Sequence, residues 1–417
     1  MDFSLEYTKG QEEFANEVRK WLDENIPKDL ISPRDAKKLS YEQWQKRREL
    51  GRKLGEKGWL NPEYLKEYGG SGLDADHSFV LHEELGKRNL GLPPYYDSGE
   101  RRAVPPLMTL GTEEQKKRFL PPILKGEVIT WQLFTEPEAG TDEANQQTST
   151  LRHIRDKDHF IINGQKIFVG GIYAPPDQFV MLTRSDLEAP RHENLSMFLV
   201  PANLPGITIQ PLGLFISAPF HGASGHSPTS AEGDKHSVFF DGVRVHESYL
   251  IGKEGDGWKA ANATLAVEHG DRSGDVGIRA EVARNVAVEK LLEQCRSNPN
   301  IVKRLRENPQ LLDSVVDIYI DAQLERLFSM RNIWLLLSGR RVPYAGPQLT
   351  MHEKMFGTRF INDTAKVLGP YTLTDDSEWG LDEDIFEVLQ RGGVCIAPGG
   401  TPEAIKIVIS RALRIGR

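Results

Sequence analysis

Glu268 is the residue whose place in the sequence best suits chemistry. In "GWKAANATLAVEHGDRSGDVG", Trp258, Ala261 and Leu265 recur at helical spacing, and Glu268 takes the next place on that apolar stripe. A carboxylate on an apolar face loses hydration, which raises its pKa and makes it a stronger base toward a carbon acid. The simpler interpretation of the residues alone is a structural glutamate paired with Arg272 at i+4.

A second candidate is the turn that precedes the last helix, in "IAPGGTPEAIKIVISR". Thr401 is a plausible N-cap, with Pro402 at the first helical position and Glu403 in the first turn. The two glycines, Gly399 and Gly400, let a ligand approach the backbone, and the helix dipole favours a negative oxygen there. Read alone, the stretch is better explained as a sharp corner.

The stretch "FTEPEAGTDEA", from Phe134 to Ala144, follows a strand-like run. It presents the hydroxyls of Thr135 and Thr141 together with bare backbone donors at a strand exit. Such groups suit the polar edge of a planar heterocycle and its phosphates, although an ordinary turn uses the same residues.

Other motifs are missing from the sequence. It contains no GxGxxG after a strand, no GxxxxGK[ST] and no HExxH, so neither a Rossmann nucleotide site nor a P-loop is supported. His221, His226 and His236 lie in or at the end of the segment 220–236, but no two have a ligand-like spacing on regular structure. We therefore expect a solvated insertion between strands there, and no metal site.

The composition is that of an ordinary acidic protein, with 417 residues and a formal net charge of -8. Nucleic acid is an unexpected partner, because phosphate binding needs a basic face. Cys295 and Cys395 form no CxxC or Cys/His pattern, which suits a reducing compartment. No apolar signal core or run of about 18 apolar residues occurs, so we expect a cytoplasmic protein with no membrane span.

The periodicity of apolar residues along the chain changes twice. Helical periodicity fills residues 1–126, short β-rich runs fill 127–248, and helical periodicity returns over 249–417. We expect an α+β multidomain fold: an N-terminal helical domain, a central β-barrel or sandwich domain and a C-terminal four-helix bundle. Ligand sites in such chains tend to lie where domains meet.

Seven stretches, taken in order, resemble the acyl-CoA dehydrogenase family over essentially the whole chain. They are "EYGGSGLDADHSFVLHEELGK", "PPLMTLGTEEQKKRFLPPILKGEVITWQLFTEPEAGTDEA", "INGQKIFVGG", "SMFLVP", "VFFDGVRV", "GDGWKAANATLAVE" and "GGTPEAIKIVISR". The family's architecture is a helical domain, a β domain and a C-terminal helical bundle, the order expected from periodicity.

The resemblance implies FAD as cofactor and an acyl-CoA thioester as substrate, oxidised to the 2,3-enoyl-CoA. A carboxylate removes the α proton, and a backbone donor stabilises the thioester oxygen. In many members the carboxylate stands where this chain has Gly399. The isovaleryl-CoA and long-chain members place it on the first long bundle helix instead, which implies Glu268 here as the catalytic base. The backbone N–H of Gly399 would then be the substrate-binding donor.

The resemblance also implies the residues that contact the cofactor and the partners of the protein. The cofactor-binding residues would be Thr135, Thr141, Phe168, Gly369, Gly400 and Thr401, with Phe168 in place of the family's usual tryptophan. An electron-transfer flavoprotein would reoxidise the flavin, and the chain would form a homotetramer or heterotetramer.

Departures from the family pattern leave alternatives open. The stretch "RSNPNIVKRLRENPQ" does not match the segment that often contacts a neighbouring subunit's FAD, and it looks more like a bacterial subgroup with paired subunits for steroid side chains. A non-catalytic partner subunit is therefore one alternative. Oxidase or elimination chemistry on a related thioester is another.

Overall fold

A computed structural model describes residues 7–30, 41–88, 99–140, 142–144, 151–170, 176–184, 188–212, 235–268, 286–338, 340, 342–370 and 401–415. The chain divides into two compact units. We call residues 17–74 and 89–268 the sheet unit, and residues 1–16, 75–88 and 269–417 the helical unit.

One eight-stranded sheet forms the centre of the sheet unit, in the order β6-β7-β3-β2-β4-β5-β8 with β1 beside β4. Antiparallel ladders join β6 to β7, β7 to β3, β3 to β2, β4 to β5 and β5 to β8. β4 pairs in parallel with β1 and, at one position, with β2. The strands are β1 (Thr130–Leu133), β2 (Arg152–Asp156), β3 (His159–Gly170), β4 (Gln178–Arg184), β5 (Leu195–Pro201), β6 (Ile207–Leu212), β7 (Lys235–His246) and β8 (Leu250–Ile251).

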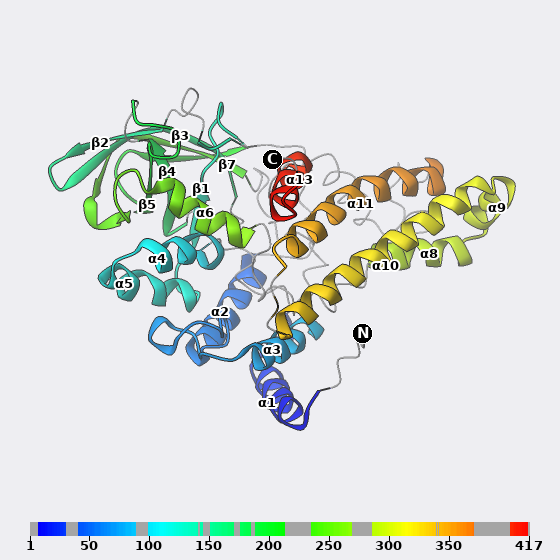
Figure 1. Cartoon of the computed structure of the whole chain (residues 1–417). Helices are drawn as coiled ribbons and strands as arrows, with labels where there is room; N and C mark the ends of the chain where they lie inside the picture. Colours follow the sequence, from blue (N-terminus) through cyan, green and yellow to red (C-terminus); the bar gives the residue numbers. More distant parts are fainter. Residues whose placement is uncertain are drawn as a thin grey trace. The chain divides into compact units, whose positions relative to one another are not determined.

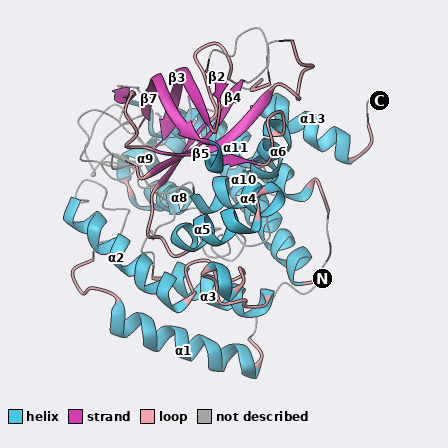
Figure 2. Cartoon of the chain, turned by 90° about the vertical axis from the view of Figure 1, so that its left-hand side faces the viewer, coloured by secondary structure: helices cyan, strands magenta, loops and turns pink. Residues whose placement is uncertain are grey.

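Helices cover one face of this sheet (Figure 1). In β4 and β5, alternate residues supply two different cores: Val180 and Leu199 face the helices, while Phe179 and Phe198 belong to an aromatic core with Trp131. Figure 2 shows these strands gathered with α4, α5 and α6 beside them. The helices and turns of the unit are α2 (Tyr41–Lys57), η2 (Lys66–Tyr68), η3 (Gly99–Ala103), α4 (Val104–Leu110), α5 (Glu113–Leu124), η4 (Glu247–Tyr249) and α6 (Gly257–Glu268). Because both faces of β4 and β5 are buried, these strands are a rigid base for neighbouring segments.

The start of α5 shows how local sequence fixes a helix and its docking. Thr112 and Gln115 form a capping box, in which each side chain bonds the other's backbone N–H. The Gln115 amide also donates to the carbonyl oxygens of Ser248 and Leu250, at 3.0 and 2.7 Å. The cap therefore also attaches α5 to the chain around β8.

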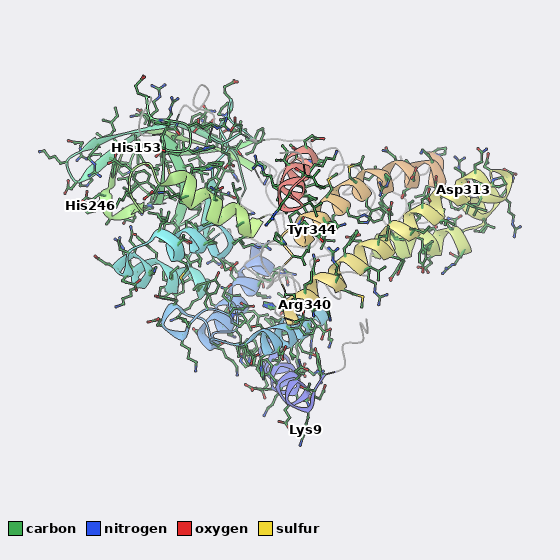
Figure 3. The ribbon with its side chains drawn as sticks, in the orientation of Figure 1. Lys9, His153, His246, Asp313, Arg340 and Tyr344 are labelled. Atoms are coloured by element: carbon green, nitrogen blue, oxygen red, sulfur yellow. The ribbon has the colours of Figure 1, made fainter. Side chains whose placement is uncertain are left out.

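In the helical unit, four helices share one apolar core that includes Leu291, Ile301, Ile318 and Phe360. Figure 1 shows α10 and α11 running side by side. The helices α8 and α9 lie near one end of α10, the end that carries Asp313, which Figure 3 labels. The helix α13 packs on α11. The bounds are α8 (Val286–Ser297), α9 (Pro299–Glu307), α10 (Gln310–Leu337), α11 (Ala345–Leu368), α13 (Pro402–Ala412) and, near the N-terminus, α3 (Ala75–Lys87) and α1 (Lys9–Asn25), of which α1 extends to both sides of the boundary at residue 16.

The predicted order of helices, sheet and helices is confirmed. The short elements α4, β2 and β8 were not predicted. β2 reads "RHIRD", and its exposed positions include Arg152, Ile154 and Arg155, so it lacks the apolar alternation that marks a strand. The division at residues 126 and 248 stays a prediction. Among the described residues, no helix is both long and apolar enough to cross a membrane.

His153 is the one inward-facing histidine of β2, and Figure 3 labels it within the sheet. Its Nδ1 lies 2.7 Å from the hydroxyl oxygen of Thr183, and its ring packs edge-on against Phe160 and Phe198. Burial lowers the pKa of His153 from 6.5 to about 4, which the nearby carboxylate of Glu254 only partly opposes. The folded protein therefore holds this imidazole neutral in a range where the unfolded chain protonates it.

We predict that His153 makes the protein less stable as the pH falls from 6.5 toward 4. The unfolded chain binds the extra proton in this range, so protonation favours unfolding, and the effect is absent at pH 7 and above. Between pH 7 and pH 5, wild type should lose about 2 kcal/mol more unfolding free energy than His153→Gln, measured by urea denaturation. Thr183→Val retains the imidazole and should keep the wild-type slope. If the unfolding free energies of wild type and His153→Gln fell in parallel with pH, the lowered pKa of His153 would be contradicted.

Candidate active site

A bulge near the end of β3 exposes an aromatic ring. The β3–β7 register runs to Lys166 opposite Val238 and resumes with Val169 opposite His236. Two residues of β3, Ile167 and Phe168, therefore stand against one residue of β7. The Phe168 side chain is 51% exposed, although its neighbours along β3 and β7 lie in a sheet with a large apolar core.

The backbone at Phe168 is strained. Its φ is 57°, in the left-handed region that a bulky side chain seldom adopts. A conformation of this kind costs about 1–2 kcal/mol and persists only where the surroundings enforce it. Strain combined with an exposed aromatic ring is typical of a site that receives a ligand.

The bulge is bonded to the segment that leaves β1. The N–H of Ile167 donates to the carbonyl oxygen of Thr135 at 3.0 Å. The ammonium of Lys166 donates to the carbonyl oxygen of Phe134 at 2.7 Å and to the carboxylate of Glu136 at 2.8 Å. Thr135 and Phe168, which lie far apart in the sequence, are thereby held in neighbouring segments. Both are predicted to bind the cofactor, a role that requires them to lie in neighbouring segments.

Lys166 and Glu136 were not predicted as site residues. Both side chains are only 2% exposed, and burial lowers the pKa of Lys166 while the charges of Glu136 and Glu143 oppose that effect. The available signal was the strand alternation: Phe160 and Ile162 point inward, and Lys166 takes an inward position of the same series. A lysine at such a position requires a buried acceptor.

These groups fit a planar, partly polar ligand such as a flavin. Phe168 offers an exposed aromatic face for stacking, and Thr135, which is half-buried, offers a hydroxyl that can donate and accept. The backbone segments that carry both residues are joined by the hydrogen bonds of Lys166 and Ile167. Preorganisation of this kind lowers the entropic cost of binding.

Glu268 is the last residue of α6. The buried face of α6 runs through Ala260, Ala261 and Thr264, whose hydroxyl donates to the carbonyl oxygen of Arg102 at 2.8 Å. Glu268 follows Thr264 by one turn, while Leu265, part of the predicted stripe, is only half-buried. The side chain of Glu268 and its alternative partner Arg272 lie outside the described residues.

The beginning of α6 explains how that helix is positioned. A Cβ at Gly257 would stand 2.5 Å from the backbone of Leu195 and Ser196, so only glycine permits the helix to approach β5 this closely. Glu268 is eleven residues further along, a rise of about 16 Å for a regular helix. The contact at Gly257 therefore determines where α6 begins on the sheet, and Glu268 lies at the other end of that helix.

The predicted cap of the last helix is confirmed. Thr401 is the N-cap of α13, and its hydroxyl oxygen accepts from the N–H of Ala404 at 3.2 Å. Pro402 occupies the first position and Glu403 lies in the first turn. The other predicted residues of the two loops, Thr141, Gly399 and Gly400, lie outside the described residues, so their roles stay predictions.

Gly369 ends α11 in a conformation that favours glycine, with φ 65° and ψ -138°. A Cβ there would meet the guanidinium of Arg304 at 3.0 Å. That guanidinium donates to the carbonyl oxygens of Lys366 and Val367, where a cation also complements the helix dipole. The need to end α11 is thus enough to explain why this position is glycine. The contact of Gly369 with the cofactor stays a prediction.

The expected solvated position of His236 is wrong. His236 lies in β7, is buried, and stacks on Trp131 with a centroid distance of 4.7 Å. The lysine before it already belongs to the ladder with β3, so the strand begins earlier than the apolar run suggested. His221 and His226 lie outside the described residues. Within the described part of the chain, no group of three or more His, Cys, Asp or Glu side chains could hold a metal ion.

Comparison with known proteins gives the family. The profile of the acyl-CoA dehydrogenase N-terminal domain matches residues 8–127, and that of the middle domain matches residues 132–223. The acyl-CoA dehydrogenase FadE26 of Mycobacterium tuberculosis is 31% identical over 428 residues, which cover 97% of this chain and 96% of that protein. The chain therefore belongs to the acyl-CoA dehydrogenase family, a family of oxidoreductases.

Two further relatives carry more specific names. The acyl-CoA dehydrogenase IpdE1 of Mycolicibacterium smegmatis is 31% identical over 270 residues, which cover 62% of this chain and 64% of IpdE1, less than two thirds of its length. The solved structure of the Tcur3481–Tcur3483 steroid ACAD is similar with a TM-score of 0.73 and 25% identity, and all of both chains is covered.

We predict that Phe168→Gly separates stability from cofactor binding. Glycine adopts a positive φ without strain, so the free energy of unfolding should stay within about 1 kcal/mol of wild type. Loss of the aromatic face should weaken binding of FAD, the cofactor of the family, by about tenfold. Thermal melts and flavin fluorescence titrations measure the two effects.

Lys157→Gly is the matched control, because Lys157 also has a positive φ, 59°, but sits in the turn between β2 and β3. It should alter stability in the same way and leave FAD affinity unchanged. Equal FAD affinity in Phe168→Gly and wild type would contradict a role for this ring.

Proposed function

We propose that the protein is an FAD-dependent acyl-CoA dehydrogenase that converts an acyl-CoA thioester to the 2,3-enoyl-CoA. The family is FAD-dependent. The observation that carries the proposal for this chain is the strained, exposed Phe168 on a strand whose preceding residue is hydrogen-bonded to Thr135, because an aromatic ring and a hydroxyl on adjoining segments suit the ring of a flavin. When bound, the flavin supplies the acceptor for the hydrogen that leaves the β carbon as hydride.

Glu268 is proposed as the base that removes the α proton. Its position at the end of α6, one turn beyond the buried Thr264, supports this role, because a carboxylate near an apolar helix face is a stronger base than a hydrated one. The turn before α13 carries no carboxylate at Gly399, and glycine cannot accept a proton.

The turn before α13 is proposed to stabilise the thioester oxygen. As the α proton leaves, that oxygen gains negative charge, and a backbone N–H aimed at it lowers the barrier. The N–H of Gly399 is the proposed donor. Thr401 and Gly400 are proposed to contact the flavin, together with Thr135, Thr141, Phe168 and Gly369. The capped N-terminus of α13 supports this assignment, because it favours negative charge nearby.

The proposed substrates are fatty or steroid acyl-CoA thioesters. The name of the Tcur3481–Tcur3483 steroid ACAD supports the steroid class. An electron-transfer flavoprotein is the proposed acceptor of the electrons. A homotetramer or heterotetramer is proposed, since that steroid ACAD is itself named for two proteins. The same name favours one second candidate function, a non-catalytic subunit that completes a heteromeric dehydrogenase.

We predict that Glu268→Gln keeps FAD bound but lowers kcat by at least about a thousandfold, because an amide cannot accept the α proton. Glu268→Asp keeps a carboxylate and should retain measurable turnover, although its shorter side chain misplaces the base. Turnover is measured with an artificial electron acceptor and FAD content by absorbance. Wild-type activity in Glu268→Gln would overturn the assignment of the base, whereas a wild type that turns over only with a second chain would favour the subunit function.

A further inference from the structure

The ion pair between Lys166 and Glu136 is buried, so its two charges lose their hydration at a cost in free energy. Each side chain is 2% exposed, and the two charges lie 2.8 Å apart. Taking both charges out of water is not fully repaid by their attraction, so a buried pair seldom adds stability compared with apolar residues of similar size. Its contacts indicate what the pair does instead.

The ammonium of Lys166 holds both neighbours of Thr135. It donates to the carbonyl oxygen of Phe134 and to the carboxylate of Glu136. The carbonyl oxygen of Thr135 itself accepts from the N–H of Ile167. Three consecutive residues after β1 are therefore bonded to two consecutive residues of β3, and this pattern fixes the backbone on which the Thr135 hydroxyl stands.

Glu136 continues this network away from β3. Its second carboxylate oxygen accepts from the N–H of Leu151 at 3.2 Å, immediately before β2 begins. Its own backbone forms two hydrogen bonds with Ala139, which close a tight turn. One carboxylate thus joins the exit of β1, the strand β3 and the entrance to β2.

Phe168 follows this network directly. Because Lys166 and Ile167 are bonded to the β1 exit while Val169 returns to the ladder with β7, the chain between them has little freedom. The left-handed conformation of Phe168 is the consequence. The network therefore restricts the backbone in a way that keeps the ring in its strained, exposed position.

We infer that Lys166 and Glu136 are a positioning pair that holds Thr135 and Phe168 in the arrangement that receives the flavin. The inference rests on the proposed function, and it adds residues that would not touch the flavin themselves. It also explains why two charges are buried at this point of the sheet.

The test compares wild type with Lys166→Met and with the double variant Lys166→Met/Glu136→Gln. The single variant leaves the Glu136 carboxylate buried without its cation and should melt well below wild type. The double variant is neutral, and the amide that replaces the Glu136 carboxylate can still accept from the N–H of Leu151 and donate where the ammonium is missing. Its melting temperature should return to within a few degrees of wild type.

Despite this recovered stability, the double variant should bind FAD at least about tenfold more weakly and show a less resolved flavin absorption band, because the rigid tether is lost. Flavin fluorescence titration and visible spectra provide these readouts. The matched control is Arg244→Met/Asp156→Gln, which removes an exposed ion pair of the same sheet and should leave FAD affinity unchanged.

Each remaining outcome contradicts the inference. A double variant that recovers both stability and FAD affinity would show that the pair is not needed for positioning. A double variant that does not fold would make the pair a requirement of the sheet itself. If the wild type binds no FAD, the proposed function fails together with the inference; if it does, failure in the double variant concerns the pair alone.

Discussion

The buried ammonium of Lys166 is the contact on which the candidate site depends. It connects the exit of β1 to the bulge of β3 through Phe134 and Glu136, and it lies in the segments that carry Thr135 and Phe168, the two residues proposed here to contact the flavin. Without a cation at this point, a carboxylate and a carbonyl oxygen would each lose a charged donor in a low-dielectric interior. On the inference drawn above, the same network keeps Phe168 in its strained conformation.

The rest of the sheet unit serves as the foundation for that network. β4 and β5 are buried on both faces, so the strands that carry the site rest on close-packed side chains. The same strands determine the course of α6, because Gly257 lies directly against the backbone of β5. One sheet thus positions both the proposed flavin contacts Thr135 and Phe168 and the helix that ends at Glu268.

The sequence predicted the periodic elements and the features with local signals. The order of helices and strands and the Thr401 cap follow from patterns within a few residues, and both are confirmed. β2 could not be predicted, because its exposed positions carry Ile154 as well as charged residues and so show no apolar alternation; what marks it as a strand is its pairing with β3. The Lys166–Glu136 pair joins positions 30 residues apart, so neither residue signals its partner locally. His236 was misplaced because its polar neighbours resemble a loop, whereas the aromatic contact with Trp131 holds it in the sheet.

The most direct test of the proposed function is the visible absorption spectrum of the purified protein, recorded without oxygen before and after adding a panel of fatty and steroid acyl-CoA thioesters. An FAD-dependent dehydrogenase should show a flavin band that at least one thioester bleaches, because the band is lost when the flavin is reduced. A colourless protein that cannot be reconstituted with FAD, or a flavin band that no thioester bleaches, would contradict this account.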